Sequence, residues 1–366
     1  MQSLSQHWNT IQATLFPILE KEVGPFTEKH QQLVTALEFA HIEDFIQTYW
    51  SCVGRPQQDR SALACAFIAK AVYNLPCTSH LIERLHCDPI LRRLCGWMTK
   101  SSIPSESTFS RAFAEFAEKR LAERAHRSFV LKFHSNRLVG HISRDATEID
   151  GREKVTKTQT SPPLPAQEKK KRGRPKKGEM RALPQPTRLE RQLTMTLSEM
   201  LDDLPKACDI GTKKNSKGFK VSWKGYKLHI DTADGDIPIS ALLTSASLHD
   251  SQVSLPLATL TAQRVRNCYD LMDSAFDAEI IRAYSVSLGH VPLIDFNHRS
   301  QKDKRTFSPH EAKRYKERSA AERVNGNLKD NFGGRLIFVK GHAKVFSHLM
   351  FGILALTILQ TMRLLT

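Results

Sequence analysis

Hydrophobic and polar residues follow two different periods along the chain. In residues 1–133, apolar residues recur at the three- and four-residue spacing of helices, and turn residues interrupt them at Gly54-Arg55-Pro56, Leu75-Pro76 and Ile103-Pro104. From Val221 onward, the alternation of half-buried strands dominates. The sequence therefore predicts a helical N-terminal region and a later region built around a sheet.

The later region has a definite order of elements. Strands are predicted at 138–150, 221–231 and 237–244, a helix at 251–264, a short strand from Cys268 that ends in an acid, a helix at 278–288 and a strand at 290–296. Three antiparallel-type strands, a helix, a strand, a helix and a strand is the order of the ribonuclease-H-like fold. We therefore expect an α/β domain with a mixed sheet and flanking helices, preceded by an all-α domain.

A polar turn separates two helices near the end of the helical region. Residues 101–108 lead into a helix with Phe109, Phe113 and Phe116 on one stripe, and the start of that helix offers Ser107, Thr108, Ser110 and Arg111. Small polar groups and a guanidinium at this position are typical of a helix that reads DNA. The alternative is an ordinary helical bundle in which the Ser and Thr residues are caps.

Charge narrows the class of partner. The net charge is +16 and the pI about 9.6, which predicts a polyanionic partner. Nucleic acid is the first interpretation and an anionic membrane surface is the second. The apolar stretch 349–359 is too short and too interrupted for a membrane span and predicts a buried core helix, and no signal peptide is found. We expect a cytoplasmic, nucleoid-associated protein with no membrane partner.

Cysteine use and nucleotide motifs exclude other classes. The seven cysteines form no Cys-x-x-Cys pair and no zinc-like spacing, so we expect reduced and mostly buried thiols. Neither a P-loop nor a G-x-G-x-x-G motif occurs, which indicates that no nucleotide cofactor is used.

A strongly basic segment lies between the first two predicted strands. Residues 169–177 carry seven cations in nine positions, a composition that cannot pack a core. Arg172-Gly173-Arg174-Pro175 resembles an AT-hook, in which Arg172 and Arg174 would lie in the minor groove of A·T-rich DNA. A basic linker that binds phosphates without groove preference is the alternative. Residues 188–204 predict a short amphipathic helix.

The most informative stretch is 315–329. On a helix, Tyr315, Arg318, Glu322 and Lys329 share one face, and the opposite side carries a set of small and apolar residues: Ala320, Ala321, Val324 and Leu328. Spacing alone is also compatible with a solvated face of ion pairs.

Tyr, two residues, Arg, three residues, Glu, six residues and Lys resembles the signature of the DDE-class insertion-sequence transposases. Residues 91–97 and 103–111 resemble the N-terminal helical domain of the same family. The resemblance implies that Glu322 is the third of three metal-binding carboxylates, and that Asp145 and Asp273 are the first two. Their competitors from the sequence are Glu148, Asp150, Asp270 and Asp277.

The resemblance also implies a mechanism. Phosphodiester transfer needs two Mg²⁺ ions, for which Mn²⁺ can substitute, and such ions prefer carboxylate ligands. Asp145 would share both ions, Asp273 would bind one and Glu322 the other. Arg318 and Lys329 would hold a phosphate, and Tyr315 would contact a base or phosphate of the DNA end.

These expectations divide the chain into three parts. Residues 1–135 form a helical DNA-binding domain, residues 136–160 and 207–366 form the catalytic domain, and residues 161–206 form a basic, disordered insertion. The expected activity is metal-dependent, cut-and-paste-type cleavage and transfer of double-stranded DNA at terminal inverted repeats, by a dimer or higher oligomer. The alternatives are a catalytically inactive, domesticated relative that binds DNA, and a ribonuclease-H-like nuclease that cuts without joining.

Overall fold

The computed structural model describes residues 2–47, 57–155, 185–214, 218–297 and 306–365. The described part of residues 2–134 forms helices and helical turns, as predicted, and these include the helix that carries the phenylalanine stripe. The α-helices of this region are α1 (Gln2–Thr10), α2 (Phe16–Val23), α3 (Glu28–Ala40), α4 (Arg60–Val72), α5 (Thr78–Cys87), α6 (Pro89–Leu94), α7 (Glu106–Glu118) and α8 (Leu121–His134).

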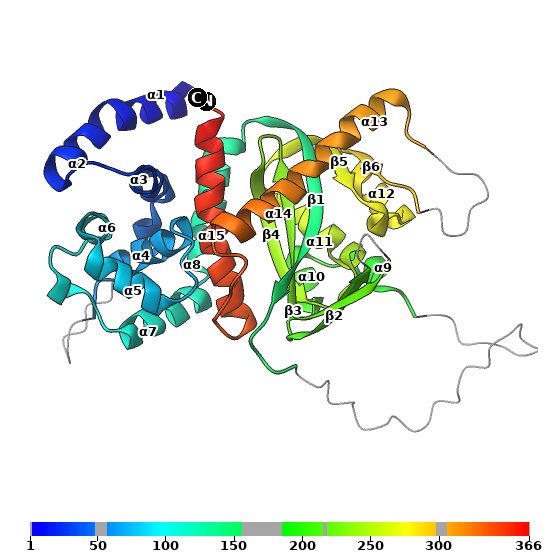
Figure 1. Cartoon of the computed structure of the whole chain (residues 1–366). Helices are drawn as coiled ribbons and strands as arrows, with labels where there is room; N and C mark the ends of the chain where they lie inside the picture. Colours follow the sequence, from blue (N-terminus) through cyan, green and yellow to red (C-terminus); the bar gives the residue numbers. More distant parts are fainter. Residues whose placement is uncertain (1, 48–56, 156–184, 215–217, 298–305, 366) are drawn as a thin grey trace, which may run out of the picture.

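One C-terminal helix, α15 (His342–Arg363), lies between the N-terminal helices and the sheet (Figure 1). It is apolar on nearly all sides, as expected for a helix buried all round. It packs against α3, α4, α7 and α8 on one side and against the sheet on the other. Phe351, for example, lies within 6.3 Å of the rings of Phe67 and Phe113, measured between ring centroids. The predicted buried core helix is therefore confirmed.

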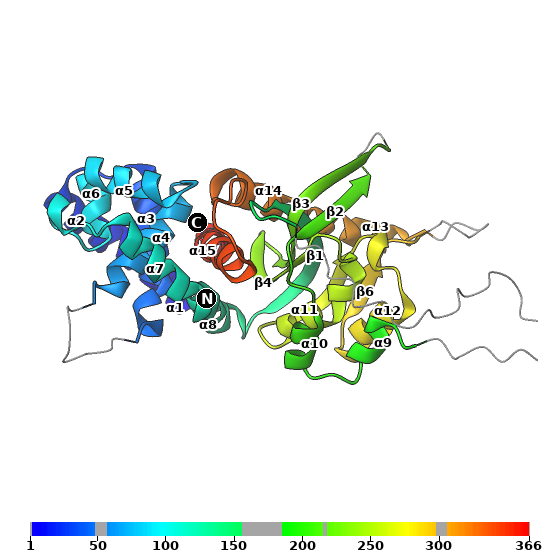
Figure 2. The ribbon, with the colours of Figure 1, turned by 90° about the horizontal axis from the view of Figure 1, so that it is seen from below.

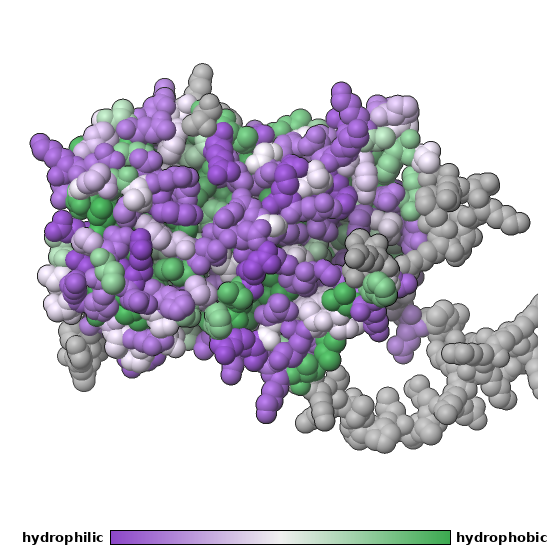
Figure 3. Space-filling model, in the orientation of Figure 1, coloured by the Kyte–Doolittle hydropathy of each residue, from purple (hydrophilic) through white to green (hydrophobic). Residues whose placement is uncertain are grey.

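The length and composition of α15, taken alone, would also suit a membrane-spanning helix. In the described part of the chain, α15 is the one helix long and apolar enough to cross a bilayer, and 89% of its apolar window is buried inside the protein. Figure 3 shows a mainly hydrophilic surface on the face viewed, with scattered apolar residues. The apolar side of α15 is thus covered by protein and needs no lipid.

The sheet has the strand order β2-β3-β1-β5-β6, and β4 pairs with β3 on the same edge as β2. β1 is antiparallel to β3 and parallel to β5, and β5 is parallel to β6. The strands are β1 (Leu138–Asp150), β2 (Asp209–Lys214), β3 (Lys220–Ala233), β4 (Ile237–Ser245), β5 (Arg266–Met272) and β6 (Val291–Ile294). Five of the six match predicted strands. β2 was not predicted, because it is short and exposed and carries no run of large apolar residues.

Helices cover both faces of the sheet (Figures 1 and 2). One face packs against α11 (Ser254–Ala262), with α10 (Leu197–Asp203) and α12 (Glu279–Ser287) beside it. The other face packs against α14 (Ser319–Asn331) and α15. The sheet is thus the middle layer of three.

Only the end of the expected insertion, residues 161–206, lies within the described part of the chain. Residues 156–184, with Arg172 and Arg174, lie outside the described residues. The end of the 161–206 range is folded, however, as α9 (Arg188–Gln192) and α10. Leu189, Met200 and Leu204 belong to the apolar clusters around α11, which explains why this part folds.

The expectation of mostly buried thiols is wrong. The described cysteines are all free, and of these only Cys95 and Cys208 are buried while Cys87 is exposed. Cys87 is the last residue of the short surface helix α5, where one side chain in three or four faces the core.

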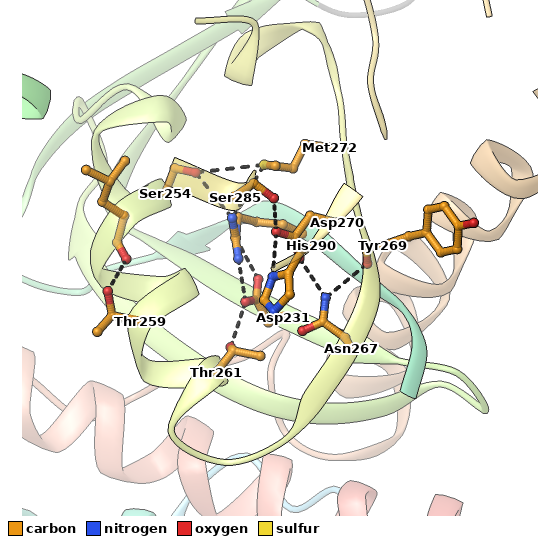
Figure 4. A network of polar contacts seen from close by, with 12 residues as sticks. Asp231, Ser254, Thr259, Thr261, Asn267, Tyr269, Asp270, Met272, Ser285 and His290 are labelled. Carbon is orange, nitrogen blue, oxygen red and sulfur yellow. Dashed lines mark hydrogen bonds and ion pairs between the residues drawn. The ribbon is translucent and has the colours of Figure 1, made fainter. Parts of the chain in front are cut away.

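An ion pair is buried between β1 and β3. Arg144 Nε lies 2.8 Å from Asp231 Oδ1 and Arg144 Nη2 lies 2.7 Å from Asp231 Oδ2, with both side chains almost fully buried. Thr261 donates to Asp231 Oδ2 at 2.7 Å, and Arg144 Nη1 donates to Ser254 at 3.2 Å (Figure 4). The pair therefore ties two neighbouring strands to α11.

We predict that Arg144→Ala lowers the free energy of unfolding by about 3–5 kcal/mol, because it leaves the buried Asp231 carboxylate without its cation. Urea denaturation measures this. The matched control is Arg323→Ala, which removes a similar two-point contact to Asp236 from a side chain that is 52% exposed. It should cost only about 0.2–1 kcal/mol. Equal losses in the two variants would contradict the importance of the buried pair.

Candidate active site

Asp145 and Asp273 lie at the same level on neighbouring parallel strands. The last pair between β1 and β5 is Ser143 with Leu271. When this register is continued by two residues in each segment, Asp145 comes opposite Asp273. Asp273 directly follows Met272, the last residue of β5, and its backbone is still extended. Since neighbouring strands lie about 4.8 Å apart, this register brings the two predicted aspartates side by side.

Both side chains belong to the face covered by α14. Arg144 points to the α11 face, so its neighbours Ser143 and Asp145 point to the opposite face. There Ser143 donates a hydrogen bond to the carbonyl of Glu317, at 3.0 Å, just before α14 begins. On β5, Met272 Sδ accepts from Arg144 and so lies on the α11 face, which leaves the next residue, Asp273, for the α14 face.

The signature stretch is helical but is not one helix. α13 (Pro309–Tyr315) ends at Tyr315, a 3-10 turn follows at Lys316–Arg318, and α14 then carries the rest. The face-sharing expected for a single helix therefore applies only from Ser319 onward, within α14. Two side-chain hydrogen bonds accompany the tight turn. Tyr315 donates to the Met272 carbonyl at 3.1 Å, and Ser319 donates to the Lys316 carbonyl at 3.0 Å.

The side of α14 predicted to meet the core does so: Ala320, Ala321, Val324 and Leu328 are buried. The other side carries Glu322 in its first turn. Arg318 Nη2 lies 2.5 Å from Glu322 Oε1, and the Arg318 guanidinium lies 6.0 Å from the centre of the Tyr315 ring. The spacing of the motif thus does bring these three side chains together.

Lys329 lies further along and has a different partner. Its Nζ is 3.4 Å from Glu148 Oε1 on β1, and Lys213 Nζ is 2.6 Å from the other oxygen of Glu148. Glu148, one of the sequence competitors for the first carboxylate, is therefore already neutralised by two lysines.

Asn325 is a site residue that the sequence reasoning missed. Its Nδ2 donates to Asp145 Oδ2 at 3.1 Å, and its side chain is buried with Oδ1 unpaired. It lies three residues after Glu322, so its place on the same helix face was a signal that could have found it. Asn325 links α14 directly to the first aspartate.

The electrostatics link the three predicted carboxylates. Burial raises the pKa of Asp145 to about 6, and the carboxylates of Asp273 and Glu322 act in the same direction, against Arg318 and the Ala146 N–H. An acid whose pKa is raised by burial and by other acids holds negative charge that a cation would stabilise.

Asp273 has acidic neighbours of its own. Burial raises its pKa, and the carboxylates of Asp250 and Asp295 add to the effect, whereas the Ala275 N–H and Arg318 oppose it. Asp295 follows β6, and Met272 pairs with Ile294, so Asp295 is level with Asp273 on the next parallel strand. Asp273 and Asp295 thus follow the ends of two adjacent parallel strands, and Asp145 is level with Asp273 but lies within β1, five residues before that strand ends.

The donor set suits a hard divalent cation. Carboxylate oxygens are what Mg²⁺ prefers, and the raised pKa of Asp145 indicates uncompensated negative charge there. Within the described residues, however, no three His, Cys, Asp or Glu side chains converge closely enough to hold an ion as they stand. Glu322 instead forms its ion pair with Arg318 and is 55% exposed, so it is free to rotate toward a cation.

The remaining competitors have structural partners. Asp270 is buried on the other side of β5 and accepts hydrogen bonds from Asn267, Ser285 and His290 (Figure 4). Asp277 binds Arg282 at 2.8 Å. Asp150 is exposed at the end of β1. The choice of Asp273 over Asp270 by strand parity thus agrees with where the two side chains lie.

Arg111, the predicted DNA contact in the N-terminal helical region, is exposed on α7. Ser105, the first residue before α7, forms no side-chain cap and shares hydrogen bonds with Ser107 and Thr108, at 3.0 and 3.3 Å between hydroxyl oxygens. Ser105, Thr108 and Arg111 line one polar hollow with Arg60. A DNA-contacting role for Arg111 stays a prediction.

Comparison with protein families gives two matches. Residues 20–115 match a family described as Transposase domain (DUF772), and residues 203–358 match a family described as Transposase DDE domain. The chain carries the domains of an insertion-sequence transposase. Asp273 and Glu322 of this transposase fall inside the DDE match, whereas Asp145 lies between the two matched ranges. Comparison with curated proteins and with solved structures gave no significant match.

The raised pKa of Asp145 predicts a pH-dependent cost to the metal-free transposase. Because its folded value of about 6 exceeds the ordinary value near 3.9, ionisation destabilises the fold as the pH rises through this window. We expect Asp145→Asn to have a higher Tm than the wild type above about pH 7 and an equal Tm below about pH 4. Thermal unfolding in a chelator measures both.

The same scan tests for the cation. Added Mg²⁺ should raise the Tm of the wild type above pH 7, since an ion that binds only the folded state stabilises it, and it should leave Asp145→Asn unchanged. The assignment of Asp145 to a cation site would be contradicted if Mg²⁺ left the wild-type Tm unchanged and the Tm of the two proteins varied identically with pH.

Proposed function

We propose that this transposase binds the terminal inverted repeats of an insertion sequence and catalyses metal-dependent cleavage and transfer of DNA strands by a cut-and-paste-type mechanism. One observation carries the proposal: Asp145 of β1 is level with Asp273, which directly follows the adjacent parallel strand β5, and the 3-10 turn and α14 bring Arg318 and Glu322 over the same face. This edge, with its mixed sheet order, is also what a ribonuclease-H-like fold requires.

Asp145, Asp273 and Glu322 are the residues that would hold two Mg²⁺ ions, or Mn²⁺ in their place. When bound, such ions activate a water or 3′-hydroxyl and stabilise charge on the phosphoryl and leaving oxygens. Asp145, the most central of the three, would contact both ions. Asn325 donates to Asp145 Oδ2 and so fixes the orientation of that carboxylate.

Arg318 has two roles available to it. In the protein alone it neutralises Glu322. If Glu322 served as a metal ligand, the Arg318 guanidinium would be available next to the site to bind a phosphate of the DNA with two parallel hydrogen bonds. Tyr315 presents its ring beside Arg318 and can stack on a base of the DNA end. Lys329, held by Glu148, adds positive charge at the end of β1.

DNA recognition is assigned to the remaining parts. The proposed contacts to double-stranded DNA are Arg111 of α7 and the AT-hook-like Arg172 and Arg174. Their contribution to the affinity for DNA should fall as the salt concentration rises. Two ends must be brought together, so the active complex is proposed to be a dimer or larger. The transposase is expected in the cytoplasm, associated with the nucleoid.

We predict that the purified transposase nicks and joins inverted-repeat ends only with Mg²⁺ or Mn²⁺, and that Glu322→Gln reduces this activity by about a hundredfold to a thousandfold, the order of loss seen when a transition-state contact is removed. DNA binding should persist, because the neutral variant removes no cation. Gel analysis of labelled ends measures cleavage and joining separately, and anisotropy measures binding.

The matched control is Glu317→Gln, an exposed acid five residues earlier whose side chain has no role in the site. It should keep wild-type activity. Strand transfer that survives in Glu322→Gln would overturn the assignment of Glu322. Cleavage without joining by the wild type would favour a nuclease, and binding without either reaction would favour a domesticated relative.

A further inference from the structure

A two-stranded ribbon extends beyond the sheet. β3 pairs with β1 only from Gly225 onward, where Gly225 is opposite Asp150, the last residue of β1. Before Gly225, β3 pairs with β2 alone, in residues 209–214 and 220–225. Figure 2 shows this hairpin projecting from the rest of the protein. We call residues 209–214 and 218–225 the lysine hairpin, because residues 210–224 of the sequence contain five lysines and no acid.

The two faces of the lysine hairpin differ. Since cross-strand partners share a face, one face carries six exposed side chains in three pairs: Ile210 with Lys224, Thr212 with Ser222, and Lys214 with Lys220. We call this the lysine face. It thus combines three cations with two hydroxyls and contains no carboxylate.

The other face of the hairpin is occupied by contacts within the protein. The Trp223 ring covers Gly211, where an added Cβ would come within 2.3 Å of the ring. The Trp223 Nε1 donates to the Tyr226 carbonyl at 3.0 Å. Lys213 binds Glu148, at 2.6 Å. Adjacent lysines in the sequence, Lys213 and Lys214, therefore have different surroundings.

The lysine face is costly without a partner. Lys214 and Lys220 are directly opposite each other, and like charges in that position destabilise a strand pair. A two-stranded ribbon is also marginally stable by itself. A bound polyanion would turn this repulsion into attraction.

The position of the hairpin relates it to the carboxylates. β1 runs from Asp145 toward Asp150, five residues on, which is about 17 Å at the rise of a strand, and the hairpin begins there. Lys220 and Lys224 are about 14 Å apart along β3, a length that spans several phosphates of one DNA strand. A duplex seated at the carboxylates can therefore reach the lysine face.

We propose that the lysine face binds the phosphate backbone of the DNA duplex whose strand is cut at Asp145, Asp273 and Glu322. The proposal rests on the proposed function and adds a contact surface to it. A two-stranded ribbon has the width to lie along a DNA groove, with alternate side chains directed at the phosphates.

The experiment compares two neighbouring lysines. The affinity of the full chain is measured by anisotropy as a function of salt, with a duplex that carries one terminal inverted repeat and its flanking DNA. Removing one lysine–phosphate pair lowers the salt slope by about 0.9, so Lys214→Gln should lower it by about that amount and Lys214→Gln/Lys220→Gln by about twice as much. The control, Lys213→Gln, has the same net charge as Lys214→Gln and should keep the wild-type slope.

The outcomes separate this proposal from the proposed function. If the wild type cleaves with Mg²⁺ but Lys214→Gln and Lys213→Gln have the same slope, the hairpin proposal is overturned and the catalytic one stands. If the slopes differ as expected but the wild type never cleaves, the lysine face still binds DNA and the catalytic proposal fails. A change in sedimentation of Lys214→Gln without DNA would instead assign the hairpin to contact between copies of the chain, and would also overturn the proposal.

Discussion

The parallel register between β1 and β5 is the constraint on which the candidate site depends. Ser143 opposite Leu271 sets Asp145 opposite Asp273, and a slip by one residue would turn Asp145 to the α11 face. The neighbouring residue, Arg144, opposes such a slip. Its guanidinium is buried against Asp231, and a slip would break this contact and leave the buried Asp231 carboxylate without its cation. A structural ion pair on one side of the sheet thus holds an acidic site on the other.

The helix that supplies the third carboxylate is held by the same core as the N-terminal helices. Val324 and Leu328 of α14 belong to one apolar cluster with residues of α3, α4, α7, α8 and α15. The end of α14 also approaches α15 closely at Gly352, where a Cβ would come within 2.4 Å of the Phe332 carbonyl oxygen. The N-terminal helices and α14 therefore share one apolar support. Under the proposed function, this support would fix DNA bound at the N-terminal helices relative to the carboxylates.

Charge is distributed unevenly around this support. The acids gather within β1 at Asp145 and just after β5 and β6, whereas lysines line the hairpin that begins five residues further along β1, at Asp150. Under the proposed function, a divalent cation would neutralise the first group and a DNA backbone the second. The substrate and its ions together would neutralise both, which is how a phosphoryl-transfer site binds DNA without excess charge of either sign.

The sequence by itself determined the elements and the chemistry of their ends. Periodicity located the strand 138–150 and the buried C-terminal helix, since these depend on local patterns of apolar residues. Motif spacing indicated Glu322 with Arg318, which meet because residues four apart on a helix are neighbours. Strand parity separated Asp273 from Asp270.

Only the tertiary structure decided what lies between distant segments. The contact of Asn325 with Asp145 joins residues 180 positions apart, and no periodicity reports it. The 3-10 turn after Tyr315 accompanies contacts to the sheet that a local pattern does not contain. The exposed strand β2 also escaped prediction, because pairing with β3 and not burial of its own side chains makes it a strand.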